Sequence, residues 1–256
     1  MASSVFDVVL REVQFWFKLI ASLCILLVGA SYYCIKFTFT GRNFCNSFNT
    51  ILLWQSIARI IGMRHHVHGI GNRIRDRPCV LVVNHQSALD IPALIPVWPK
   101  RSTFVAKRSI VLYASFGLLV WFLKAILIDR SNRDGSIHKL KDLAKIIQNE
   151  KVSVIIFPEG TRGDGKSGLL PFKKGAFHLA IEAQVPIQPV VIAPYSGLDI
   201  SKRLAIGGVC DIFVLPSVST SGLTASDANS LADRVRKDMS NVYLSSLSRE
   251  FDEASS

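Results

Sequence analysis

Two polar segments carry most of the residues that could do chemistry. "VLVVNHQSALDIP" places Asn84, His85 and Asp90 directly after an apolar run, and "VIIFPEGTR" places Glu159 and Arg162 after another. A histidine of near-neutral pKa can take a proton from an alcohol when a carboxylate fixes its tautomer. A spacing of five does not put two side chains on one helical face, so His85 and Asp90 can meet only if His85 lies in a loop and Asp90 in the first turn of a helix.

The first segment also has interpretations without a general base. Ser87 and Asp90 have the spacing of a helix capping box, which requires no chemistry. Ser87 as a covalent nucleophile would need the G-x-S-x-G turn that exposes such a serine, and this pattern is absent. General-base catalysis and a structural cap therefore both remain open on these residues alone.

The second segment contains a pattern that is typical of phosphate-binding loops. The pattern G-x-x-x-x-G-K-S is matched by Gly160, Gly165, Lys166 and Ser167. This alternative makes the chain a nucleotide hydrolase that uses Gly160 to Ser167. Such a loop needs its Lys-Ser pair to open a helix, and Gly168 and Pro171 disfavour a helix at that point.

Composition favours an anionic partner and contact with lipid. The formal net charge is +11, from 30 Lys and Arg against 19 Asp and Glu, and 49% of the residues are hydrophobic. The basic residues occur as scattered pairs without a nucleic-acid reading motif, so we expect no nucleic acid as partner. A phospholipid membrane and a phosphorylated substrate remain as candidates.

The N-terminal segment is predicted to be a retained membrane anchor. Leu19–Ile35 is free of charges, ends at Lys18 and Lys36, and is at the short limit for a membrane span. Apolar residues between Phe48 and Ile61 indicate a second, partly amphipathic helix, so crossing the bilayer and insertion into one leaflet both remain open. A further apolar run, Ile110–Leu123, is predicted to be a buried or interfacial helix because it is too short to span.

Cysteines and histidines indicate neither a disulfide framework nor a metal site. The five cysteines include no C-x-x-C pair, which favours free thiols in a reducing compartment. His65, His66 and His68 have no further Cys, His or acid at ligand spacing, so no metal is predicted.

From about residue 66, short apolar runs alternate with helical patterns, which predicts an α/β fold. The expected sheet is mixed and largely parallel, with helices on both faces and a membrane-anchoring helical segment before it. The expected organisation is anchoring helices over 1–64, an α/β domain over 65–249 and a frayed tail over 250–256. The predicted strands are Cys79–Val83, Thr103–Ala106, Ala125–Ile128, Val152–Phe157, Ile187–Ala193 and Leu204–Leu215. The last helix is predicted to start at Thr224, where Thr-x-x-Asp is a capping signal.

Four motifs in order resemble the 1-acylglycerol-3-phosphate acyltransferase (lysophosphatidate acyltransferase) family, in particular its eukaryotic, endoplasmic-reticulum branch. The motifs are "NHQSALD", "KAILIDR", "FPEGTR" and "VPIQPV", and the resemblance covers about residues 80 to 245. It implies transfer of an acyl group from acyl-CoA to the sn-2 hydroxyl of lysophosphatidate. The product, phosphatidate, feeds phospholipid and triacylglycerol biosynthesis. A membrane-anchored lipid-binding protein without turnover is the main alternative.

The resemblance also implies roles for individual residues. His85 matches the general base and Asp90 the residue that orients it. The residues that match substrate-binding positions are Asn84, Lys107, Arg130, Glu159, Gly160, Thr161 and Arg162. The residues that match an acyl-binding segment are Val185, Pro186, Ile187 and Pro189. No cofactor is implied beyond acyl-CoA as co-substrate, and the implied location is the endoplasmic-reticulum membrane with the catalytic domain facing the cytosol. The family usually has other residues at Lys124, Leu127 and Gln188, which bears on acceptor and acyl preference.

Overall fold

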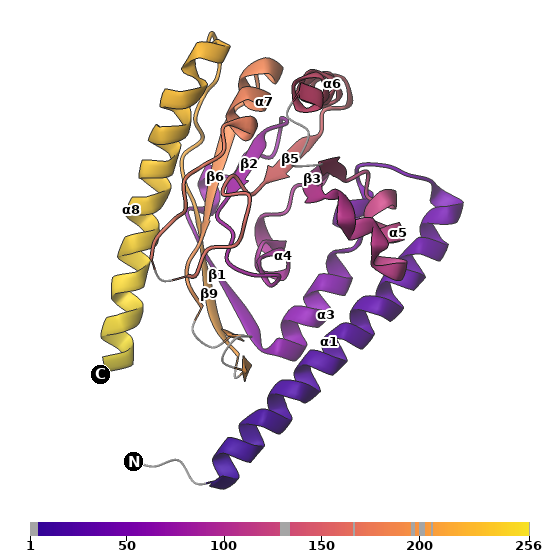
Figure 1. Cartoon of the computed structure of the whole chain (residues 1–256), viewed down its shortest axis with the longest axis vertical. Coiled ribbons are helices and arrows are strands. Elements are labelled where there is room, and N and C mark those ends of the chain that lie inside the picture. Colours follow the sequence, from indigo (N-terminus) through magenta and orange to yellow (C-terminus); the bar gives the residue numbers. More distant parts are fainter. Residues whose placement is uncertain are drawn as a thin grey trace.

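A seven-stranded sheet forms the centre of the molecule (Figure 1). The computed structural model describes residues 5–128, 134–165, 167–195, 198–199, 203–205 and 207–255. The strand order is β1-β9-β6-β2-β5-β3-β4. The bounds are β1 (Met63–His68), β2 (Val80–Val83), β3 (Ser102–Lys107), β4 (Ile126–Ile128), β5 (Ser153–Ile156), β6 (Ile187–Ile192) and β9 (Gly208–Val214). A separate pair, β7 (Leu198–Asp199) and β8 (Leu204–Ala205), is antiparallel.

The sheet is mixed and largely parallel, as predicted. Every neighbouring pair is parallel except β6 and β9, so β1 and β9 run opposite to the other five strands. The central strand β2 is buried along its whole length. A parallel strand covered on both faces reads as a continuous apolar run, which is why this strand was visible in the sequence.

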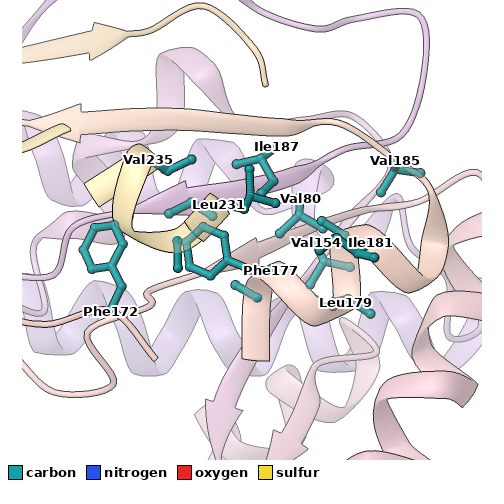
Figure 2. Close-up of a cluster of buried hydrophobic side chains, with 14 of the residues drawn as sticks. Val80, Val154, Phe172, Phe177, Leu179, Ile181, Val185, Ile187, Leu231 and Val235 are labelled. Carbon is teal, nitrogen blue, oxygen red and sulfur yellow. The ribbon is translucent and has the colours of Figure 1, made fainter. Parts of the chain in front are cut away.

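Helices cover both faces of the sheet. On one face lie α6 (Asp134–Glu150), α7 (Gly175–Ala183) and α8 (Ala228–Ser255), and their apolar side chains pack against β2, β5 and β6 in the cluster shown in Figure 2. On the other face lie α3 (Ile51–Ile61), α4 (Asp90–Ala93) and the short η2 (Ile95–Val97). Further short elements are α2 (Asn46–Asn49), η1 (Ile70–Asn72) and η4 (Ala225–Asp227). This layering fixes the ends of the central strands on a rigid core.

The N-terminal helix α1 (Val5–Thr40) lies outside this arrangement, on the side away from α8 (Figure 1). By length and composition it is the one helix in the described part of the chain that could cross a membrane. It packs against α3 and α5 (Ala114–Phe122) through a small core that includes Tyr33, Phe37 and Leu53. The predicted second helix is therefore present as α3.

The run Ile110–Leu123 is not one continuous helix. It contains the end of η3 (Arg108–Leu112), and α5 starts at Ala114, whose φ is +41°, after a break at Tyr113. Leu119 and Phe122 are buried, whereas Leu112 and Trp121 are exposed. The segment is thus partly buried and partly surface, in line with the prediction of a helix that does not span.

The bounds of one predicted strand are wrong. The expected strand Leu204–Leu215 is divided at Gly207, where φ is +82° and a Cβ would lie 2.8 Å from the Gly62 carbonyl oxygen. β1 begins at Met63, and the predicted division into anchoring helices and an α/β domain near residue 65 stays a prediction. The tail predicted to fray from Glu250 continues α8 to Ser255, because no glycine or proline interrupts this stretch. The capping box of Thr224 and Asp227 is present, but it opens η4, and α8 follows at Ala228.

The phosphate-loop alternative is also wrong. Residues Ser167 to Lys174 contain no helix, and the next helix, α7, begins at Gly175. Gly168 has a φ of +87°, a left-handed conformation that ends local helical geometry. The helix N-terminus that would direct amides at a nucleotide phosphate is therefore missing at this position.

Candidate active site

The carboxyl ends of parallel strands bring the two polar segments together. β2 and β5 are neighbours with Val82 opposite Ile156, so the segments that follow them leave the sheet side by side. The backbone amide of His85 donates to Oε1 of Glu159 at 2.8 Å, although the two residues are 74 positions apart. Strand ends of this kind are where α/β sheets bind ligands.

His85 and Asp90 form a hydrogen-bonded pair. The distance from Nδ1 of His85 to Oδ2 of Asp90 is 2.7 Å, and the Asp90 side chain is completely buried. Asp90 is the first residue of α4, as the spacing required. When Nδ1 carries the proton that Asp90 accepts, Nε2 of the neutral ring is left as a base. The His85 side chain is 23% exposed and its ring stacks on Phe157, so solvent and ligands can reach a ring held in place.

The Asp90 carboxylate has further donors that fix it. The backbone amides of Gln86 and Ser87 donate to Oδ2 at 2.8 and 3.1 Å. The hydroxyl of Tyr195 donates to Oδ1 at 2.9 Å. These contacts stabilise the ionised carboxylate and keep it pointing at His85. The Ser87 amide makes one bond of the predicted capping box, but α4 begins after Leu89 without a side-chain cap, so the box itself is not formed.

Glu159 holds the two loops together. The carboxylate is buried, with 4% of the residue exposed, and accepts from the amide of His85 through one oxygen and from the amide of Leu170 (2.9 Å) through the other. Burial raises the pKa of Glu159, and these two backbone bonds act in the opposite direction. The His85 carbonyl in turn accepts from the Gly163 amide at 2.8 Å. The described contacts of Glu159 therefore position the His85 backbone.

The remainder of "FPEGTR" forms an exposed turn. Gly160 has a φ of +68°, and a Cβ at this position would lie 2.6 Å from Cε of Lys173. The side chains of Thr161 and Arg162 that follow are exposed. The segment thus places a guanidinium group and the end of Lys173 around a tight turn beside the histidine loop.

Asn84 is a packing residue in this structure. It is fully buried, its amide nitrogen donates to the Ile192 carbonyl at 2.9 Å, and its oxygen accepts from the Ile192 amide at 2.8 Å. These bonds connect the end of β2 to the end of β6. Both polar atoms of the buried Asn84 side chain are engaged in this clamp, and its predicted contact with substrate stays a prediction.

Of the two other predicted phosphate-binding cations, Lys107 and Arg130, only Lys107 lies in the described part of the chain. Lys107 ends β3 opposite Ile128, the last residue of β4, and is exposed. Two strand spacings separate β3 from β2, or about 10 Å, which is within the reach of a lysine side chain and a glycerophosphate together. Arg130 follows β4 in the sequence and lies outside the described residues.

The structure places the segment "VPIQPV" in the core of the domain, and its acyl-binding role stays a prediction. Ile187 and Pro189 belong to β6, a strand buried at every position, and Val185 precedes it in the same core (Figure 2). Pro186 is partly buried. A strand covered by helices on both faces must be apolar, so packing accounts for these residues without a ligand.

Two residues of the site were not predicted. Tyr195 follows β6 and contacts both Asp90 and Oγ of Ser87, at 2.9 and 3.0 Å. Burial raises its pKa well above the ordinary value, so it is a hydrogen-bond donor at physiological pH. Lys173 packs over Gly160. For Tyr195, the available signal was a polar residue just after an apolar strand, which is the signal that identified His85.

The comparisons with known proteins cover the part of the chain that forms this site. The acyltransferase family model matches residues 64–193, which include every described site residue except Tyr195. The human 1-acyl-sn-glycerol-3-phosphate acyltransferase alpha is 41% identical over 79% of this chain and 72% of its own length. The human beta form is 35% identical over 91% and 85%, and the Saccharomyces cerevisiae 1-acyl-sn-glycerol-3-phosphate acyltransferase is 32% identical over 88% and 77%.

The fold is likewise shared with a solved structure. The crystal structure of the 1-acyl-sn-glycerophosphate acyltransferase PlsC from Thermotoga maritima superimposes with a TM-score of 0.69, covering 93% of this chain and 95% of that one at 23% identity. At 23% identity, this structural similarity shows a shared fold and no more. The family assignment follows from the matching family model and the curated relatives: the chain belongs to the acyltransferase family, among the 1-acylglycerol-3-phosphate acyltransferases.

Proposed function

We propose that this chain transfers an acyl group from acyl-CoA to the sn-2 hydroxyl of 1-acylglycerol-3-phosphate and so makes phosphatidate. The single observation that carries the proposal is the His85–Asp90 pair, oriented by buried contacts at the carboxyl end of β2. The relatives named for this activity supply the substrate class.

His85 acts as general base through Nε2. It removes the proton from the acceptor hydroxyl, and the oxygen attacks the thioester carbonyl to form a tetrahedral oxyanion. The intermediate collapses by breaking the carbon–sulfur bond, and the imidazolium can return its proton to the departing thiolate. General-base help of this kind contributes about a hundred- to ten-thousand-fold.

The loop of Glu159 supplies groups for orientation and charge. Of the two backbone amides in this turn, that of Gly160 already donates to the Phe157 carbonyl at 3.2 Å. The amide of Thr161 is therefore the candidate donor to the oxyanion. Arg162, Lys107 and Lys173 are exposed cations that suit the acceptor phosphate, and arginine can bind two of its oxygens at once. Arg130 stays a candidate from the sequence resemblance.

The domain works at a membrane surface, with α1 lying along it. Contacts between α1 and the rest of the chain run from Glu12, whose Oε2 is 3.4 Å from Arg203, to Phe37, whose ring packs on Phe122. From Glu12 to Phe37 the helix rises about 38 Å, more than the roughly 30 Å of a hydrocarbon core. Because the domain accompanies the helix over this length, insertion into one leaflet is favoured over a perpendicular span.

The exposed apolar side chains suit this placement. They extend along α1 and continue on η3, α3 and α5, and include Phe17, Val28, Leu52, Leu112 and Trp121. An apolar hollow of about 410 Å³ between α1 and α3 is lined in part by Val28, Leu52 and Leu53. An apolar surface of this kind is favourably buried among the acyl chains of a membrane, and the acceptor lipid is found in the same membrane.

An endoplasmic-reticulum membrane with the domain facing the cytosol is the proposed location. All five cysteines are free in the described chain, which fits a reducing compartment.

The test is a transfer assay with the full chain in phospholipid–detergent micelles. Labelled acyl-CoA and lysophosphatidate should give phosphatidate, and His85→Ala should lower kcat by at least about a hundredfold. His178→Ala, a partly buried histidine on α7, is the matched control and should retain activity. A wild type that binds lysophosphatidate without turnover would establish the lipid-binding alternative instead.

A further inference from the structure

The edge of the sheet farthest from β4 carries a cluster that acyl transfer does not use. β1 is the edge strand there, and its alternate residues His66 and His68 share one face. Asp211 on β9 stands opposite His66 in register. Its Oδ1 lies 3.1 Å from Nδ1 of His66 and 2.6 Å from Nε2 of His68. The sequence shows only the histidines as neighbours, because the aspartate is 143 positions from His68.

We propose that His66, His68 and Asp211 form a binding site for a divalent transition-metal ion of the zinc type. The three candidate ligand atoms all lie within 4.8 Å of one another. Zinc binds imidazole nitrogen and carboxylate oxygen at about 2.0–2.2 Å, which sets the edges of a tetrahedron at about 3.4 Å. The two separations from the Asp211 oxygen, 3.1 and 2.6 Å, differ from that edge by less than about 1 Å.

The donor set selects the class of ion. Two imidazoles and one carboxylate suit zinc, copper or nickel, whereas calcium and magnesium prefer oxygen ligands. The two imidazole nitrogens lie next to the same carboxylate oxygen of Asp211. An ion bound between them needs neutral imidazoles, so each ring binds it through this nitrogen and carries its one proton on the other nitrogen. The His66 side chain is 65% exposed, which leaves a path for the ion and a position for water.

The strands hold the ligands close to this arrangement in advance. Hydrogen bonds between β1 and β9 run from Met63 to His68 and fix the backbone of all three residues. The His68 ring stacks on Phe213, with centroids 4.4 Å apart and planes 10° apart. His65, between the two ligands, points to the other face and contacts the Pro92 carbonyl at 2.9 Å, so it is outside the site.

The ion would act on stability and not on acyl transfer. Two strands, β9 and β6, separate β1 from β2, which carries His85 at its end. β1 also follows α3 directly and pairs only with β9 in the described sheet, so an ion bridging the two strands would attach the membrane-side helices more firmly to the domain. Because the ion binds the folded chain, it should raise thermal stability in proportion to its occupancy.

Calorimetric titration with Zn²⁺ tests the site on the full chain, purified without a polyhistidine tag and stripped of metal. We expect one saturable site per chain and an increase in the unfolding temperature on zinc addition. Asp211→Asn should weaken binding at least about tenfold, the loss seen even for outer partners of a metal. His66→Gln/His68→Gln should abolish both effects, and Co²⁺ in the wild type should give visible absorption bands of tetrahedral coordination.

His65→Gln is the matched control, because it removes a histidine of the same strand that faces away from the site. It should bind zinc as the wild type does. Acyl transfer measured without added metal should stay near the wild-type rate in the His66→Gln/His68→Gln variant, which shows that this variant is folded. Wild-type binding that survives in the double variant, or no saturable zinc binding by the wild type, would overturn the proposal while leaving the proposed acyl transfer untouched.

Discussion

Glu159→Gln changes one oxygen of a buried carboxylate into an amide nitrogen and keeps the size of the side chain. In the native chain each oxygen accepts one backbone amide, from His85 at 2.8 Å and from Leu170 at 2.9 Å. Glutamine offers a single acceptor and one donor group. In either rotamer, one of the two backbone amides therefore faces another donor and loses its partner.

The size of the effect follows from these contacts. A hydrogen bond to a charged group contributes about 1.5–3 kcal/mol, and a buried donor without a partner adds to its loss. The carboxylate itself is costly to bury, which is the cause of its raised pKa, and its removal offsets part of the loss. A net destabilisation of about 1–3 kcal/mol lowers the unfolding temperature of a chain of this size by roughly 3 to 10 °C.

Thermal unfolding and steady-state kinetics measure the two consequences separately. Because Glu159 holds the backbone of His85, the variant should lose kcat, while KM for lysophosphatidate should change less than about twofold. Glu182→Gln on α7 is the matched control, since this glutamate is exposed and its substitution should stay within about 0.5 kcal/mol. A Glu159→Gln variant as stable as the wild type, with KM raised tenfold, would refute the positioning role and indicate direct contact with the acceptor.

Three further substitutions or reactions test other parts of the site. Tyr195→Phe removes the hydroxyl that donates to Asp90 and should cost about 0.5–1.5 kcal/mol of stability with a several-fold lower kcat; an unchanged kcat in the transfer assay would place Tyr195 outside the orienting network. Gly160→Ala adds a Cβ at a φ of +68° against a lysine side chain and should destabilise by about 1–3 kcal/mol in thermal unfolding, whereas Gly71→Ala, which has open space, should not; equal effects would contradict this account. Burial raises the pKa of Cys79 to about 11, so its thiol stays protonated at pH 8 and should resist maleimide in the native chain, read by mass spectrometry, but react after denaturation; rapid native labelling would contradict its burial.

Much of the architecture could be predicted because burial leaves a mark on the sequence. The central strands β2, β5 and β6 are covered on both faces and appear as short apolar runs, and the predicted bounds of β2 and β5 are within two residues of the observed ones. The same apolar pattern leaves the role of "VPIQPV" open. An apolar strand reads the same whether a ligand or a helix covers it, so the sequence could not separate acyl binding from core packing.

The divided strand around Gly207 and the long α8 show the limits of local patterns. Gly207 is required by the backbone of Gly62, which approaches it from 145 positions away. The residues next to Gly207 in the sequence do not indicate this contact with Gly62. The end of α8 could not be read from the sequence for a different reason. A polar tail can be helical when no glycine or proline interrupts it.

For the site itself, the sequence determined the chemical types and the tertiary structure decided their partners. The histidine, the carboxylate five residues later and the glycine-containing turn are local features, and the His85–Asp90 pair needs only a short loop and the first turn of α4. The Glu159 clamp, the Tyr195 donor and the Asp211 ligand join segments that are 74 to 143 positions apart. Which side chains meet across such distances depends on strand order and register, and these are fixed by packing of the whole domain rather than by the pattern around any one residue.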